Sequence, residues 1–238
     1  MKAITFDLWN TIFKNHFYNQ TRFRFFADFL KNKGISISKE KLASGFKKGF
    51  YLSELNIEDI GYRHIHTEER IKNLFKFLGL EQNSNQISTI KEEFESFMLE
   101  DPPDLKSGVI KTLNQTSNNY RIGLISNTGV TPGKIIEKVL EKYEILKYFD
   151  STVYSDEIGV YKPHPKIFRM ALKELQSSPG ETLHVGDILE TDIKGAKNLG
   201  MKAVWIENRN IKPSEDLMPN YKITRLDELL KILKTLLD

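Results

Sequence analysis

Two hydrophobic patterns divide this chain of 238 residues. From about residue 102 onward, short apolar runs rich in Val, Ile and Leu alternate with amphipathic stretches of helical spacing. The runs predict buried strands, and the stretches between them predict helices that pack on a parallel sheet. The predicted strands are 121–125, 151–154, 182–186 and 202–206, and the predicted helices are 133–143, 165–175, 192–199 and a closing helix at 226–237.

The segment before residue 102 has a different pattern. Residues 3–6 are apolar and β-prone and end at Asp7, so they predict a further buried strand. Between about 17 and 99, apolar residues recur every three to four positions, and Asn, Gly and Ser separate the runs. This spacing predicts a small bundle of helices without strands, which ends at a linker-like run, 101–104. We therefore predict a doubly wound α/β domain (1–13 and 102–238) with an inserted helical domain (14–101).

Composition narrows the classes of function. The chain has no cysteine, which excludes disulfides, thiolate metal sites and thiol catalysis. Its net charge of +3 is spread along the sequence, which argues against nucleic acid as the main partner. No apolar run approaches the roughly 20 residues that span a bilayer, and the N-terminal apolar run is too short for a signal peptide. We expect a cytoplasmic protein, monomeric or homodimeric, that acts on a small molecule.

Polar side chains follow the predicted strands at their carboxyl ends, where parallel sheets bind ligands. Asp7, Ser126 and Asp187 directly follow three of these strands, and Lys162 lies in the loop after a fourth. Each has an ordinary structural explanation by itself, because carboxylates cap helices, serines occupy turns and lysines are usually solvated. Their coincidence along one edge of the sheet is what favours a shared site.

The segments around these residues resemble the motifs of the haloacid dehalogenase superfamily. The motifs are Asp7-Leu8-Trp9-Asn10-Thr11, Ser126-Asn127, Lys162-Pro163, and Gly186-Asp187 followed by Thr191-Asp192. The resemblance covers the whole chain, because the predicted helical segment stands where many members of that superfamily insert a cap. It implies a Rossmann-like core and a cap that sets specificity and closes over the substrate.

The resemblance also implies a reaction and its residues. Asp7 would attack a small phosphorylated metabolite and form an aspartyl-phosphate, which splits one difficult displacement into two easier ones. Ser126 and Lys162 would hold the phosphoryl group, because its negative charge must be neutralised as the nucleophile approaches. Asn127 would help to orient the substrate, and Thr11 would steady the turn after the nucleophile.

A magnesium ion is part of the same expectation. Mg²⁺ takes oxygen ligands from a few carboxylates together with waters and phosphate. Members of the superfamily also use a backbone carbonyl two residues after the nucleophile. In this chain Asp7, Asp187 and the carbonyl of Trp9 would hold the ion, with Asp192 as a direct or water-mediated partner.

Trp9 departs from the superfamily pattern. Phosphatases of this kind usually carry a second aspartate there, which protonates the leaving group and then activates water. An indole has no proton that titrates near neutral pH, and general acid–base catalysis is typically worth about 10²–10⁴-fold in rate. We therefore expect a preference for good leaving groups such as acyl phosphates, or a replacement acid, for which Glu190 and His164 are candidates.

Three other functions stay open. A 2-haloacid dehalogenase often carries an aromatic residue at the Trp9 position and needs no proton for its halide, but it usually lacks the pair Asp187 and Asp192. A phosphonate hydrolase would need a cap lysine, Lys47 or Lys48, to form a Schiff base. A protein that has lost its acid could instead bind a phosphorylated ligand with little or no turnover.

The intact aspartate pair favours the Mg²⁺-dependent phosphatase over the dehalogenase. Against the phosphonate hydrolase, most lysines of the helical segment should be solvated. Against the binding protein, the chain retains Asp7, Lys162, Asp187 and Asp192.

Histidines carry weaker predictions. His64 and His66 fall in a short polar loop, and their spacing would suit a metal only if a third ligand lay nearby. His184 lies within a predicted buried strand, so we expect an ordinary core histidine with a hydrogen-bond partner.

The inserted segment carries two further predictions. Arg22 and Arg24 could reach a substrate carboxylate, although solvated arginines are the more common outcome on a helix of this kind. The aromatic residues between 17 and 29 exceed what one helix face needs. Most of them should form the core of the insert, while one or two face the active site or a second subunit.

Overall fold

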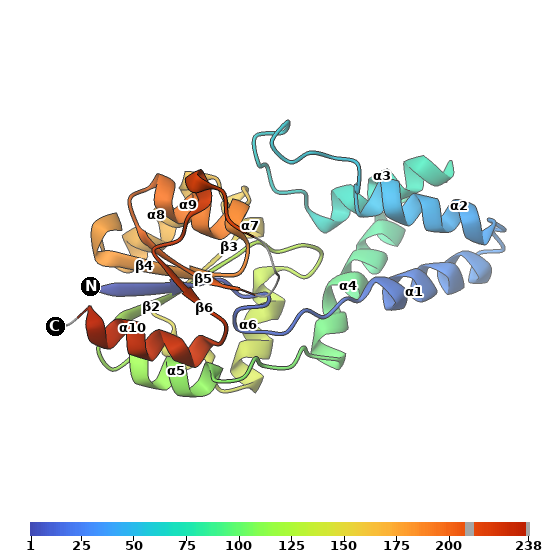
Figure 1. Ribbon diagram of the computed structural model, residues 1–238. Helices are drawn as coiled ribbons and strands as arrows, with labels where there is room; N and C mark the ends of the chain where they lie inside the picture. Colours follow the sequence, from blue (N-terminus) through green and yellow to red (C-terminus); the bar gives the residue numbers. More distant parts are fainter. Residues whose placement is uncertain (208–211, 237–238) are drawn as a thin grey trace.

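In the computed structural model, which describes residues 1–207 and 212–236, six parallel strands form one sheet in the order β3-β2-β1-β4-β5-β6 (Figure 1). The strands are β1 (Ala3–Phe6), β2 (Arg121–Ser126), β3 (Ser151–Tyr154), β4 (Thr182–Gly186), β5 (Lys202–Ile206) and β6 (Tyr221–Ile223). The strand order reverses between β1 and β4, so the crevice that parallel sheets use for ligands lies at the end of β1.

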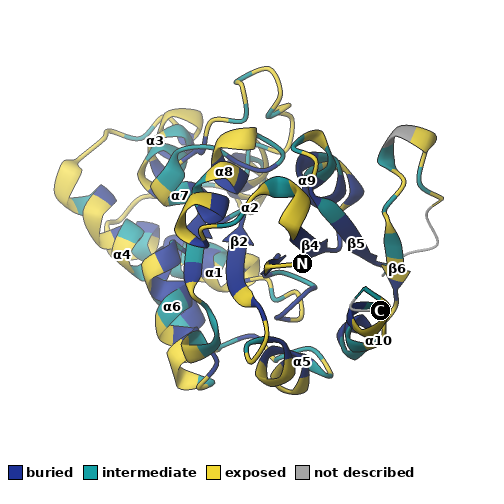
Figure 2. Cartoon of the chain, turned by 90° about the vertical axis from the view of Figure 1, so that its left-hand side faces the viewer, coloured by how far each residue is buried: buried dark blue, intermediate teal, exposed yellow. Residues whose placement is uncertain are grey.

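Helices cover both faces of this sheet, which confirms the predicted doubly wound fold (Figures 1 and 2). Figure 2 shows buried strands enclosed by helices whose outer faces are exposed. The helices of the sheet domain are α5 (Val109–Thr116), α6 (Gly133–Lys142), α7 (Ser155–Ile158), α8 (Pro165–Glu174), α9 (Lys194–Asn198) and α10 (Leu229–Thr235). Short 3₁₀ turns lie at Leu146–Tyr148, Pro179–Glu181, Glu215–Leu217 and Leu226–Glu228, and a π turn lies at Leu189–Ile193.

The predicted elements of the sheet domain are confirmed, with small differences at their ends. The predicted helix 192–199 begins earlier, as the π turn, and continues as α9. The closing helix begins as a 3₁₀ turn and runs as α10 to Thr235, and the predicted end at Leu237 lies outside the described residues. The sequence analysis did not predict α5 or β6.

The segment between β1 and α5 is helical. It contains α1 (Asn19–Asn32), α2 (Lys39–Ser44), the π-helix η1 (Gly45–Phe50), α3 (Thr67–Leu78) and α4 (Ser84–Glu100). Figure 1 shows these helices beside the sheet domain, at the end where α6 lies, and we call them the helical insert. Its domain boundaries at 14 and 101 stay a prediction. Within residues 1–207 and 212–236, no helix combines the length and apolar character that crossing a bilayer requires.

Aromatic rings form the interior of the insert. Phe26 is fully buried and contacts Phe46 and Phe75 at ring-centroid distances of 5.8 and 5.7 Å. Phe94 of α4 lies 5.2 Å from the ring of Phe50. Such ring contacts add to the free energy gained by burying apolar area. The prediction that aromatic residues form this core therefore holds for Phe26, whereas Phe17, which is 72% exposed, lies outside it.

Candidate functional site

The register of the sheet brings three predicted site residues to one edge. Phe6 of β1 is level with Leu124 of β2 and with Val185 of β4, so the residues that follow these strands lie side by side. The backbone N–H of Asp7 continues the ladder by donating to the carbonyl of Val185 at 2.8 Å. Asp7, Ser126 and Asp187 therefore meet at the carboxyl ends of the strands, at the switch point of the sheet.

Lys162 joins this edge as a buried cation. Its ammonium group is 1% exposed and donates to Asp7 Oδ1 at 2.5 Å, to Asp192 Oδ1 at 2.7 Å and to the carbonyl of Ile125 at 2.9 Å. Burial opposes the charged form, but the two carboxylates raise the pKa of Lys162 above its usual value. The lysine is therefore a fixed positive charge that bridges two carboxylates.

Asn127 positions this lysine. Its Oδ1 accepts from the backbone N–H of Lys162 at 2.7 Å, and its Nδ2 donates to the carbonyl of the same residue at 3.3 Å. Both polar atoms of the side chain are thus used within the protein, while the residue still lines the pocket. The predicted contact of Asn127 with substrate stays a prediction, and the structure adds a role in holding the lysine loop.

The two carboxylates on Lys162 have opposite titration behaviour. Burial raises the pKa of Asp7 to about 7, against the opposing attraction of Lys162. Asp192 is equally buried, but Lys162 and the neighbouring His184 hold its pKa below the usual range. The second oxygen of Asp192 also accepts the backbone N–H of Ile188 at 3.0 Å. Asp192 is therefore ionised in the folded protein, whereas the charge of Asp7 depends on the balance between its burial and the attraction of nearby cations such as Lys162.

A glycine is required where the fourth motif begins. A Cβ atom on Gly186 would lie 2.4 Å from Cγ of Asp192, closer than atoms of this kind approach. Any side chain there would push Asp192 away from Lys162. The local sequence Gly186-Asp187 therefore follows from the close packing of the second aspartate against the strand end.

Three carboxylates lie close enough to hold one metal ion. Oxygen atoms of Asp7, Asp187 and Asp192 lie within 4.8 Å of one another, and the three side chains are buried. Asp187 is oriented through Asn10, whose Nδ2 donates to Asp187 Oδ2 at 3.1 Å, and through Trp205, whose indole N–H donates to its carbonyl at 2.9 Å. Clustered carboxylate oxygens suit a hard cation such as Mg²⁺.

An open pocket of about 270 Å³ lies over this edge of the sheet. Asp7, Lys162 and Asp187 are buried residues that line it, together with Trp9 and Glu190. The structure thus brings these predicted residues together in one pocket. His164, the other acid that was considered, does not line it; its Nδ1 accepts the backbone N–H of Lys166 at the start of α8.

The two predicted hydroxyl groups, of Ser126 and Thr11, do not line the pocket. Ser126 and Thr11 are both fully buried, and their side-chain oxygens have no hydrogen-bond partner among the described residues. Buried polar atoms without a partner are uncommon and call for an explanation. A ligand oxygen that reaches the end of β2 would supply a partner for the Ser126 hydroxyl, which fits the predicted contact with a phosphoryl group.

The sequence analysis missed Asn10 and Trp205 as site residues. Asn10 adopts a left-handed backbone conformation with φ of 57°, which asparagine tolerates better than most residues. Trp205 was predicted only as part of a strand, and its contact with Asp187 depends on the pairing of β4 with β5. The local signal that could have identified Asn10 was its place inside the motif Asp7-Leu8-Trp9-Asn10-Thr11.

The predictions for histidines and arginines had mixed outcomes. His184 is a core histidine, as predicted, with Nδ1 2.8 Å from the Thr5 hydroxyl. His64 and His66 lie in a loop, but His64 is only 2% exposed, and the described residues include no metal-type cluster that contains either one. The expectation of a solvated arginine was wrong for Arg22, because α1 packs against α4 and encloses it. Arg24 is exposed, as expected.

Comparisons with known proteins agree with this geometry. Residues 1–200 match the family model described as a haloacid dehalogenase-like hydrolase. The glyceraldehyde 3-phosphate phosphatase of Pyrococcus furiosus is 41% identical over 133 residues, which are 53% of each chain. The present chain thus spans about half the length of the curated relatives it matches.

Two solved structures cover nearly the whole chain. The HAD phosphatase from Thermococcus onnurineus has 27% sequence identity and a TM-score of 0.64, with 98% of both chains covered. The 2-haloacid dehalogenase from Pseudomonas syringae has 23% identity and a TM-score of 0.75 over 99% of both chains, a likeness of fold alone. Together with the family match, the fold and the four motifs lead to one conclusion. The chain belongs to the haloacid dehalogenase-like hydrolase family.

Proposed function

We propose that this protein is a Mg²⁺-dependent phosphatase of small phosphorylated metabolites and that Asp7 is its nucleophile. The observation that carries the proposal is the buried Lys162 between Asp7 and Asp192, with Asp187 beside them at the floor of an open pocket. A transferring phosphoryl group is anionic, so its site needs fixed cations next to the nucleophile. The 41% identity to a protein named as a phosphatase supports the same choice.

Two displacements at phosphorus make up the proposed reaction. A carboxylate oxygen of Asp7 attacks phosphorus, a bond forms between them, and the bond from phosphorus to the leaving oxygen breaks with its electron pair. Lys162 offsets the charge on the phosphoryl oxygens, and the Ser126 hydroxyl donates to one of them. Water then attacks phosphorus of the aspartyl-phosphate, and the bond from phosphorus to the Asp7 oxygen breaks. The carboxylate is restored, and the protons of the water leave with inorganic phosphate or pass to solvent.

Asp7, Asp187 and the backbone carbonyl of Trp9 would hold the magnesium ion. When bound, it neutralises negative charge on the nucleophile and on the phosphoryl oxygens. Both oxygens of Asp192 already accept hydrogen bonds, from Lys162 and from the Ile188 N–H. We therefore assign Asp192 to a water-mediated contact with the ion and to the positioning of Lys162.

Trp9 determines which leaving groups the site tolerates. It lines the pocket at the position where a carboxylic acid would protonate the leaving oxygen, and an indole cannot do this. Acyl phosphates and aryl phosphates leave as weakly basic anions and need little help from an acid. Glu190 also lines the pocket and is the one replacement acid considered above that reaches it.

We further propose that the helical insert, residues 14–101, acts as a cap over this pocket. The segment enters the insert directly after the nucleophile motif and returns to the sheet domain through 101–104. Asn15, from the entering segment, lines the pocket together with Asp7 and Lys162. Movement of the insert would therefore change access to the nucleophile.

Hydrolysis of activated phosphates tests the proposal. Purified protein is assayed with acetyl phosphate and p-nitrophenyl phosphate, with Mg²⁺ and with EDTA, and with Asp7→Asn as the control variant. We expect turnover that requires both Mg²⁺ and Asp7 and that exceeds turnover of a simple alkyl phosphate. Absence of turnover with both substrates would sink the phosphatase proposal. Metal-independent release of halide from 2-chloropropionate would then identify a dehalogenase.

A further inference from the structure

Arg22 of the helical insert is a buried cation without an anionic partner. The side chain is 5% exposed, and its guanidinium donates to the carbonyl of Phe94 through Nε at 3.2 Å and through Nη2 at 3.1 Å. Nη2 also lies 3.5 Å from the Thr131 hydroxyl, the limit of a hydrogen bond. In residues 1–207 and 212–236 no carboxylate forms an ion pair with Arg22. Burial of a charge without a counter-charge is unfavourable.

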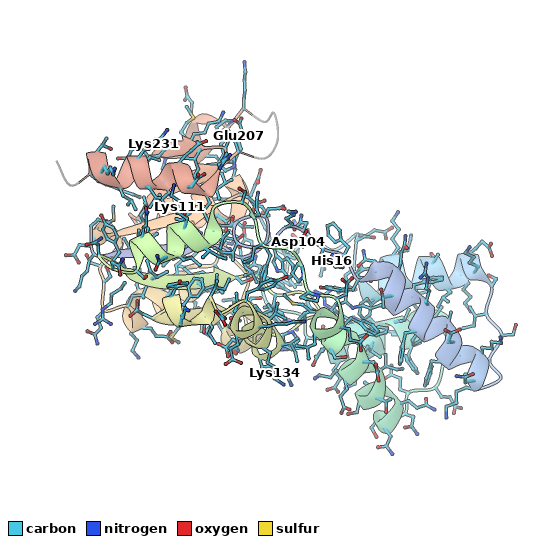
Figure 3. All side chains as sticks on the ribbon, turned by 90° about the horizontal axis from the view of Figure 1, so that it is seen from below. His16, Asp104, Lys111, Lys134, Glu207 and Lys231 are labelled. Atoms are coloured by element: carbon cyan, nitrogen blue, oxygen red, sulfur yellow. The ribbon has the colours of Figure 1, made fainter. Side chains whose placement is uncertain are left out.

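This guanidinium faces a second pocket, of about 260 Å³, between the insert and the sheet domain. No carboxylate lines this pocket, and Arg22 is the one lysine or arginine in its described wall. His16 also lines it, and Figure 3 shows His16 at the junction of the two parts of the molecule, near Asp104. The pocket is open to solvent on one side and has a buried positive charge in its wall, which suits a small anionic group.

The second pocket adjoins the catalytic one. Trp9, Asn15 and Asn127 line both. A molecule whose phosphoryl group lies on Asp7 and Lys162 would thus extend past Trp9 toward Arg22. We assign the leaving group of the substrate to this side of Trp9.

We propose that Arg22 binds a second anionic group on the leaving-group side of the substrate, so that the preferred substrates are small phosphorylated compounds with a carboxylate or a second phosphoryl group. This inference rests on the proposed phosphatase function and narrows its substrate class. The guanidinium supplies planar donors that match both kinds of anion. An anion there would offset the burial that lowers the pKa of Arg22 in the free protein.

Matched ligands test the inference without any need for turnover. Glycerol 3-phosphate and 3-phosphoglycerate differ only in a hydroxymethyl group that is replaced by a carboxylate. Their affinities for Asp7→Asn protein are measured by calorimetry with Mg²⁺ present. We expect 3-phosphoglycerate to bind about 10- to 100-fold more tightly, the range of a charge-assisted hydrogen-bonded pair. Propane-1,3-diol bisphosphate, compared with its monophosphate, tests a second phosphoryl group as the source of the anion.

Two arginines on the same helix provide the control. Addition of Arg22→Met to Asp7→Asn is expected to bring the affinity ratio close to one, while addition of Arg24→Met, an exposed position, leaves it unchanged. Arg22→Lys keeps the charge but loses the planar fork, and it should retain part of the advantage. Thermal unfolding shows whether the Arg22→Met variant is folded. If it is not, the affinity ratio is measured on Arg22→Lys instead.

The outcomes separate the inference from the proposed function. The inference is overturned if neither anionic probe binds more tightly than its neutral counterpart, or if the advantage survives Arg22→Met. Wild-type turnover of acetyl phosphate reports on the phosphatase function independently. Turnover of acetyl phosphate without preferential binding of the anionic probes would support the phosphatase function and contradict the role of Arg22. Preferential binding of the anionic probes without turnover would support Arg22 as an anion-binding residue and contradict the phosphatase function.

Discussion

Among the residues that the structure describes, the sheet domain and the helical insert each bury one lysine or arginine side chain, with different partners. Lys162 is 1% exposed and lies between two carboxylates of its own domain, at 2.5 and 2.7 Å. Arg22 is 5% exposed, and it contacts a carbonyl, a hydroxyl and the ring of Tyr18, whose centroid lies 5.4 Å from the guanidinium carbon. Desolvation is unfavourable for both charges, but among the described residues only Lys162 has carboxylates as counter-charges. We infer that Lys162 has its counter-charges already in the free protein, whereas Arg22 takes an anionic partner from the bound substrate.

The largest expected effect comes from the sheet domain. Asp7→Asn keeps the size of the nucleophile but removes its negative charge, so no covalent intermediate can form. We expect kcat/KM for acetyl phosphate to fall by about 10⁴-fold or more. Asp104→Asn is the matched control, because its side chain is 75% exposed and pairs only with Lys14. Equal activity of the two variants would remove Asp7 from the mechanism.

The stability of the two buried cations sharpens the comparison. Lys162→Met leaves Asp7 and Asp192 buried without their cation, and we expect the free energy of unfolding to fall by about 3–5 kcal/mol. Arg22→Met leaves no buried carboxylate without a partner, so the free energy of unfolding should fall by less. We expect about 1–2 kcal/mol, because the Phe94 carbonyl loses its hydrogen bonds. Urea unfolding measures both.

An exposed lysine provides the reference for these measurements. Lys14 pairs with Asp104 at 3.0 Å, but the two side chains are 60% and 75% exposed. Lys14→Met should therefore change the free energy of unfolding by less than about 1 kcal/mol. If Arg22→Met were as destabilising as Lys162→Met, Arg22 would have an internal counter-charge, and the contrast between the two regions would be lost.

Trp9 lines both pockets. Its replacement tests whether the indole limits the leaving group because it is not an acid or because of its size. Trp9→Asp introduces an acid that can protonate a leaving oxygen, and we expect kcat/KM for an alkyl phosphate to rise about 10- to 100-fold relative to acetyl phosphate. Trp9→Asn has the same size as the aspartate but no such proton. An equal rise in both variants would mean that the indole blocks alkyl substrates sterically.

The sequence predicted the sheet domain more fully than the contacts within the site. Strands β3, β4 and β5 have the predicted bounds, because each is a short apolar run that is buried on both faces. The missed β6 has three residues with an exposed lysine in the middle, too little for a pattern. Helix α5 buries Thr112 and Thr116 along with its apolar residues, which hides its amphipathic spacing.

In the candidate site, too, the sequence predicts positions along strands better than contacts between distant elements. Asp7, Ser126 and Asp187 could be placed together because each ends or directly follows a strand, and parallel strands end at one edge. The burial of Arg22 could not be foreseen, since it depends on the packing of α1 against the backbone of α4 at Phe94. Local spacing reports which face of a helix is apolar, but not which polar residue a neighbouring helix will cover.

His64 gives the smallest expected effect and tests the junction between the two regions. The sequence analysis placed it in a polar loop, but it is buried, with Nδ1 3.1 Å from the Ser155 hydroxyl and its backbone N–H donating to Gly159. Burial, reinforced by the neighbouring His66, lowers the pKa of His64 from 6.5 to about 3. The imidazole is therefore neutral in the folded protein over a range where the unfolded chain protonates it.

The sign of the pH effect follows from this difference. Between pH 6.5 and about 3 the unfolded chain binds more protons at His64 than the folded protein does, so stability falls as the pH is lowered. The loss from this group should approach about 1.4 kcal/mol per pH unit and vanish above pH 6.5. Urea unfolding near pH 7, 6 and 5 should show a shallower slope for His64→Gln than for wild type, whereas His66→Gln, an exposed position, keeps more of the wild-type slope. Identical slopes for wild type and His64→Gln would show that the junction opens to solvent before the rest of the molecule unfolds, in which case the insert moves as a separate body on the sheet domain.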